Sequence, residues 1–109
     1  MKVSEGYSVL IIDMTYDREK DFVFSGFPTV ELANEFARRW VRDSVEELRA
    51  ANQTREELRR MWFTFGEDAS VLGGEPHYAG SHELDFFIDH PANAAERDWY
   101  EIKRLAGLA

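Results

Sequence analysis

The chain has 109 residues, of which 44% are hydrophobic and 14% aromatic, and its formal net charge is −8. This length and composition are typical of one folded domain and exclude wholesale disorder, so we predict a single domain over residues 1–109. Because the chain has no cysteine and no long apolar run, disulfides, thiolate metal sites, cysteine nucleophiles and membrane-spanning helices are excluded.

The first predicted elements are two strands joined as a hairpin. Residues 7–14 are rich in β-branched side chains and are apolar on both faces in their middle, which is typical of a central strand. Residues 21–25 form a second short apolar run, and the polar stretch 15–20 separates the two. We therefore predict an antiparallel pair with a charged, solvent-facing loop.

A long amphipathic helix is predicted next. Thr29 follows a Gly-Phe-Pro break and can cap the helix through its hydroxyl, and Glu31 lies in the first turn, where the helix dipole favours an acid. Apolar and small residues then recur at three- and four-residue steps, which indicates one buried stripe. The stripe comprises Ala33, Phe36, Ala37, Trp40, Val41, Ser44, Val45 and Leu48.

The middle of the chain is predicted to combine a short helix with more sheet. Thr54 and Glu57 have the spacing of a capping box, which indicates the start of a second, short helix. Residues 61–65 are aromatic and favour a strand, residues 66–68 favour a turn, and residues 69–72 favour a further short strand.

The last third is predicted to contain a loop, a strand and a helix. Residues 73–82 favour a loop, and residues 84–89 favour a final strand. Asn93 and Glu96 repeat the capping spacing before a terminal helix. The element order predicts an α+β two-layer sandwich, with a mostly antiparallel sheet of about four strands covered on one face by two main helices and one short helix.

The negative charge is concentrated in one segment. Residues 61–96 contain no Lys or Arg and seven acids, which is −7 of the net −8, whereas residues 29–60 balance seven acids against seven arginines. A localised negative field attracts basic protein surfaces and cations and repels phosphate backbones. We predict that the partner-binding residues are Glu67, Asp68, Glu75, Glu83, Asp85 and Asp89.

The function that this pattern favours is a non-catalytic interaction protein that binds a basic protein surface. Its most specific form is a bacterial or phage inhibitor that imitates nucleic acid, as small acidic anti-defence proteins of phages and mobile elements do, with carboxylates in the phosphate sites of a nucleic-acid-binding protein. The alternative is that the acids serve only solubility. The first residues do not resemble a signal peptide, so we expect a cytoplasmic protein that binds neither nucleic acid directly nor membranes.

The competing hypothesis is a small metal-binding protein or a metal-dependent enzyme that uses a cluster of histidines and carboxylates. His77, His82 and His90 lie among four acids within a short segment, and imidazole with carboxylate suits zinc, iron or nickel. Their spacing matches no known metal motif, and a loop-rich acidic segment collects such residues by composition alone.

Other activities lack their sequence signatures. There is no nucleophile elbow, no dinucleotide fingerprint and no P-loop, so we expect no cofactor and favour a protein that is not an enzyme. The aromatic run that contains Trp62, Phe63 and Phe65 places one exposed apolar side on a strand, and we predict a homodimer or partner contact there.

Overall fold

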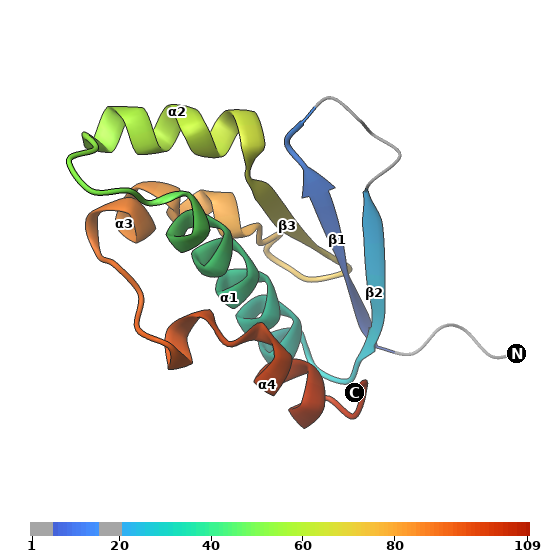
Figure 1. The fold of residues 1–109 in the computed structure, drawn as a ribbon. Helices are drawn as coiled ribbons and strands as arrows, with labels where there is room; N and C mark the ends of the chain where they lie inside the picture. Colours follow the sequence, from blue (N-terminus) through green and yellow to red (C-terminus); the bar gives the residue numbers. More distant parts are fainter. Residues whose placement is uncertain (1–5, 16–20) are drawn as a thin grey trace, which may run out of the picture.

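The structure, a computed structural model, describes residues 6–15 and 21–109. Its sheet centres on β1 (Tyr7–Asp13), which pairs on one side with β2 (Phe22–Phe27) and on the other with β3 (Glu67–Leu72) (Figure 1). Both pairings are antiparallel, so the strand order is β2-β1-β3.

The first two strands and their pairing agree with the sequence prediction. Val9 and Ile11 alternate with half-buried neighbours along β1 and are fully buried, as expected for a central strand with one face on the core. The register pairs Val9 with Phe24 and Ile11 with Phe22, which places aromatic side chains beside this apolar face. Residues 16–20 of the predicted loop lie outside the described part of the chain.

The long helix α1 (Val30–Leu48) packs on all three strands. It begins where predicted, because the Thr29 hydroxyl accepts a hydrogen bond from the Leu32 N–H at 3.1 Å. Most of the predicted stripe is buried, with Phe36 and Val41 fully enclosed, while Trp40 is half-buried at its margin. One cluster of buried side chains joins this helix to the sheet and to every other main helix.

The next helix is longer than the sequence suggested. α2 (Arg55–Phe65) starts at the predicted capping box, where Thr54 and Glu57 exchange hydrogen bonds. The predicted strand at 61–65 is wrong, because this helix runs straight through it. Leu58 and Trp62, four residues apart, are its buried residues, and this packing outweighs the strand preference of the aromatic side chains.

The position of β3 follows from that helix. Because α2 ends at Phe65, the predicted turn at 66–68 reduces to Gly66, and the strand predicted at 69–72 already begins at Glu67. A β-carbon on Gly66 would lie 2.4 Å from the Trp62 ring, so the tight junction requires glycine. After β3, Ala79 forms an isolated bridge to Ser70. It is followed by a short 3₁₀ helix, η2 (Gly80–Glu83), in a segment where the sequence predicted mainly loop.

The predicted strand at 84–89 is also wrong, because these residues form α3 (Leu84–Asp89). Leu84, Phe87 and Ile88 are buried at helical spacing against α1 and α2. Residues 6–15 and 21–109 therefore contain three strands rather than about four, and the fold is α+β with a three-stranded antiparallel sheet. The more specific two-layer sandwich is not confirmed, since α2 and α3 pack mainly on α1 and on each other (Figure 1).

The chain ends in a 3₁₀ turn and a helix. Asn93 and Glu96 exchange the predicted capping hydrogen bonds, but these start η3 (Ala95–Arg97). The terminal helix α4 (Trp99–Leu105) has its own cap at Asp98 and buries Ile102 against α1. Within the described ranges, none of these helices combines the length and apolar character of a membrane span.

Candidate functional site

The acids of α3 are engaged by arginines of α2. Arg55 donates two hydrogen bonds to Asp89, at 2.9 and 3.1 Å, and Arg59 donates to Asp85 at 3.1 Å. The hydrogen bonds from Arg55 lower the pKa of Asp89 from its usual value. Two of the predicted partner-binding residues are thus already paired inside the protein.

Glu83 is engaged in the same way by α1. Its carboxylate accepts hydrogen bonds from Arg38 at 3.0 Å and from the Tyr78 hydroxyl at 2.5 Å. Burial of Tyr78, together with its hydrogen bond to this carboxylate, raises the pKa of the phenol well above its usual value, so Tyr78 remains a donor. The arrangement fastens the loop before α3 to α1 and leaves little of Glu83 for a partner.

Two further arginines, one in α1 and one directly after it, satisfy the C-terminal end of α3. Arg42, only 8% exposed, donates to the His90 carbonyl at 2.7 Å, and Arg49 donates to the carbonyls of Phe87 and Ile88, both at 3.1 Å. These carbonyls have no partner within a short helix, and cations are favoured there by the helix dipole. Five of the seven arginines in residues 29–60 therefore hold the acidic segment against α1 and α2.

The remaining predicted acids divide into structural and free groups. Asp68 accepts hydrogen bonds from both the backbone N–H and the hydroxyl of Ser81, at 3.0 and 2.6 Å, which tie β3 to η2. Glu67 contacts α1, as described below. Glu75 is exposed and makes no hydrogen bond or ion pair with any residue that the structure describes.

The three histidines do not form one group. The rings of His77 and His82 lie 5.9 Å apart, and His77 also contacts the Ser70 hydroxyl through its Nε2 atom at 3.1 Å. His90 instead stacks on Phe86 at 4.1 Å, at the end of α3. Among residues 6–15 and 21–109, no three His, Asp or Glu side chains are grouped to hold a metal ion.

The aromatic run on α2 does expose two rings, although on a helix rather than a strand. Phe63 is 44% exposed and Phe65 is 55% exposed, whereas Trp62 is fully buried. A helix turns by about 200° between residues two apart, so Phe63 and Phe65 do not form the single sticky side that a strand would give. Whether either mediates a dimer stays a prediction.

A second group of acids lies elsewhere, around two tryptophans. A depression of about 180 Å³ is lined by Trp40, Asp43, Ser44, Glu47, Glu67 and Trp99, and we call it the tryptophan cleft. The two indole rings pack at 4.5 Å between centroids. α1, α4 and the first residue of β3 supply these side chains.

Each indole of the tryptophan cleft is held by a carboxylate. Trp40 Nε1 donates to Glu67 at 2.8 Å, and Trp99 Nε1 donates to Asp43 at 3.3 Å. The backbone N–H of Glu67 also donates to the Ser44 hydroxyl at 2.9 Å, so the start of β3 is bonded to α1 twice. These bonds fix the rings and the carboxylates relative to one another before any ligand arrives.

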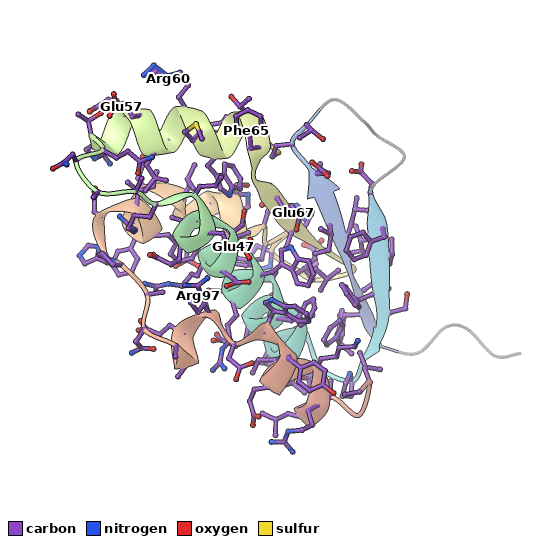
Figure 2. All side chains as sticks on the ribbon, viewed as in Figure 1. Glu47, Glu57, Arg60, Phe65, Glu67 and Arg97 are labelled. Carbon is purple, nitrogen blue, oxygen red and sulfur yellow. The ribbon has the colours of Figure 1, made fainter. Side chains whose placement is uncertain are left out.

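The charges of the tryptophan cleft are only partly balanced. Arg97 pairs with Asp43 at 2.6 Å. Glu67 has the neutral Trp40 indole as its side-chain partner, and exposed Glu47 has no partner within the described residues. Figure 2 shows Glu47 on α1 and Glu67 at the start of β3 on the same side of the molecule. Two unneutralised carboxylates beside aromatic rings form an environment that suits an organic cation.

Sequence reasoning missed most of this site. Trp40, Asp43 and Glu47 follow one another at three- and four-residue steps, so a helical projection could have grouped them. Nothing local indicated that Glu67 or Trp99 would join them, because both come from distant elements.

The Trp40–Glu67 hydrogen bond allows a direct test of this geometry. Trp40→Phe keeps an aromatic ring among its neighbours but removes the N–H donor to a carboxylate, and we expect a loss of about 1.5–3 kcal/mol in the free energy of unfolding. Urea denaturation followed by circular dichroism measures it. Glu67→Gln, which retains an acceptor oxygen, should cost less, and a cost of Trp40→Phe below about 0.5 kcal/mol would show that the bond contributes little.

No family model matches the sequence, and no curated protein or solved structure matches it either.

Proposed function

We propose that the protein is a non-catalytic interaction protein that binds a basic protein segment at the tryptophan cleft. The observation that carries the proposal is that Glu47, with no partner in the described part of the chain, stands with Glu67 beside two fixed indole rings. A lysine or arginine side chain placed there gains both carboxylates as ion-pair partners and the ring faces for cation–π contact.

In this proposal the partner does not bind to most of the acidic segment that the sequence analysis predicted. Glu83, Asp85 and Asp89 already bind arginines, so a partner would have to displace those arginines to use them. Displacement would give up these ion pairs, and at Glu83 it would also remove the acceptor of the half-buried Tyr78 hydroxyl. Glu67 is the one residue of the predicted set that lines the new site.

The net charge still contributes to association. At −8, the chain attracts a basic partner over distances of about one Debye length, roughly 8–10 Å at physiological salt. Mimicry of nucleic acid would require a row of free carboxylates, and the pairing of three predicted acids with arginine removes support for that more specific form.

Charge reversal at one residue tests the proposal. Titration with a lysine-rich peptide, followed by the fluorescence of Trp40 and Trp99, should show binding to the unmodified protein that weakens with added salt. Glu47→Lys should weaken binding by about tenfold or more, because the new cation faces the bound one.

Glu75→Lys is the matched control, since it makes the same charge change at an exposed acid outside the tryptophan cleft. It should change the affinity by less than about threefold, through long-range attraction alone. Equal losses from the two variants would mean that only net charge matters, and the cleft would then have no special role.

A further inference from the structure

An apolar groove lies next to the tryptophan cleft, between the end of α1 and α2. It is an open depression of about 570 Å³, whose apolar lining includes Leu48, Ala51 and Met61. Met61 is 37% exposed, so part of its apolar side chain is open to a ligand in the groove. Glu57 and Arg60 lie at its rim and point outward from α2 (Figure 2).

The groove and the tryptophan cleft share one face of α1. Trp40, Ser44 and Glu47 line the cleft, and Leu48 lines the groove, at successive helical steps. Trp40 and Leu48 are about 12 Å apart along the helix axis, because each residue rises about 1.5 Å. The two depressions adjoin at Glu47 and Leu48, and we call them together the strip, which has the apolar groove at one end and the acidic tryptophan cleft at the other.

We propose that this strip receives an amphipathic basic helix of a partner protein. Apolar side chains at positions i and i+4 of that helix would occupy the groove, and Lys or Arg at i+7 and i+11 would enter the tryptophan cleft. The inference rests on the proposed function and adds the class of partner. Two helical turns span about 10.8 Å, which is close to the rise of about 12 Å along α1 between Trp40 in the cleft and Leu48 in the groove.

A helix fits this strip better than an extended peptide does. The walls of the strip are mainly helices, and their backbone N–H and C=O groups are already bonded within α1 and α2. An extended peptide would find few backbone partners there, whereas a helix satisfies its own backbone groups and contributes only side chains. The acidic end then selects for charge, because an acidic helix would be repelled by Glu47 and Glu67.

The probe is a synthetic alanine-based helix of about 16 residues, with Leu at i and i+4 and Lys at i+7 and i+11. A second peptide carries Gln in place of both Leu residues. We expect the Leu peptide to bind at least fivefold more tightly than the Gln peptide, as measured by tryptophan fluorescence and confirmed by calorimetry.

Met61→Gln tests the groove without changing the charge. It should weaken binding of the Leu peptide about five- to tenfold and leave binding of the Gln peptide unchanged. Phe63→Gln is the matched control, because Phe63 has similar exposure on the same helix but does not line the groove. Circular dichroism shows whether each variant remains folded.

The possible failures are distinguishable. If both peptides bind equally, or if Met61→Gln and Phe63→Gln have equal effects, the helix inference is wrong, while a selective effect of Glu47→Lys would still support the proposed function. If Glu47→Lys has no larger effect than Glu75→Lys on either peptide, the proposed function is wrong, and the inference that rests on it is wrong as well.

Discussion

Trp62→Ala is expected to lower the free energy of unfolding by about 3–5 kcal/mol, because it leaves a large cavity at a fully buried site. Among the described residues, Trp62 has the largest fully buried side chain. It lies in the central cluster with Val41 and Leu58. Urea denaturation followed by far-ultraviolet circular dichroism measures the change without depending on tryptophan fluorescence.

Trp62→Phe is the informative control. The indole N–H of Trp62 is buried without a hydrogen-bond partner in residues 6–15 and 21–109, so its loss removes an unsatisfied donor along with some volume. We expect this variant to cost less than half as much as Trp62→Ala. A small effect of Trp62→Ala would contradict the burial of this side chain and the helical assignment of residues 61–65.

The elements that the sequence predicted correctly carry strong local signals. Thr29 and the pair Thr54 and Glu57 cap their helices through bonds that span only three residues, so spacing in the sequence is enough to find them. The apolar stripe lies on a helix of 19 residues and repeats from Ala33 to Leu48, which no strand period can imitate.

The elements that were predicted wrongly are short apolar runs, for which periodicity cannot separate helix from strand. Residues 84–89 became helical because the end of α3 receives Arg42 and Arg49, side chains that come from about 40 positions earlier. Aromatic content favoured a strand at 61–65, but burial of Trp62 on the same face as Leu58 selected the helix. The helical conformation of both segments depends on contacts with residues far away in the sequence, which a short stretch of sequence does not contain.

The same limitation explains the misplaced site. Asp85 and Asp89 stand one helical turn apart on α3, and so do Arg55 and Arg59 on α2, so the two pairs face one another. With residues 84–89 interpreted as a strand, this match was hidden, and the acidic segment appeared free. Arg38, Arg55 and Arg59 pair with acids there. Glu47 has no cation partner among the described residues, which no count of charge along the chain reveals.

Gly80→Ala is expected to lower the free energy of unfolding by about 1–3 kcal/mol, because the chain at η2 approaches α1 too closely for a side chain. A β-carbon on Gly80 would lie 2.2 Å from Val41 Cγ2 and 3.1 Å from the Ala37 carbonyl oxygen. The Val41 side chain cannot turn away easily, because a β-branched residue in a helix has one preferred rotamer.

The strain should therefore move η2 away from α1 and weaken the contacts on both sides of it. These are the hydrogen bonds from Ser81 to Asp68 and the ion pair between Arg38 and Glu83. A double-mutant cycle with Val41→Ala isolates the cause, since removal of Cγ2 relieves the shortest contact, and Gly80→Ala should then cost at least about 0.5 kcal/mol less. Equal costs in the two backgrounds would show that Cγ2 of Val41 does not impose glycine at this position, and the contact with Val41 Cβ at 2.7 Å would remain as the cause.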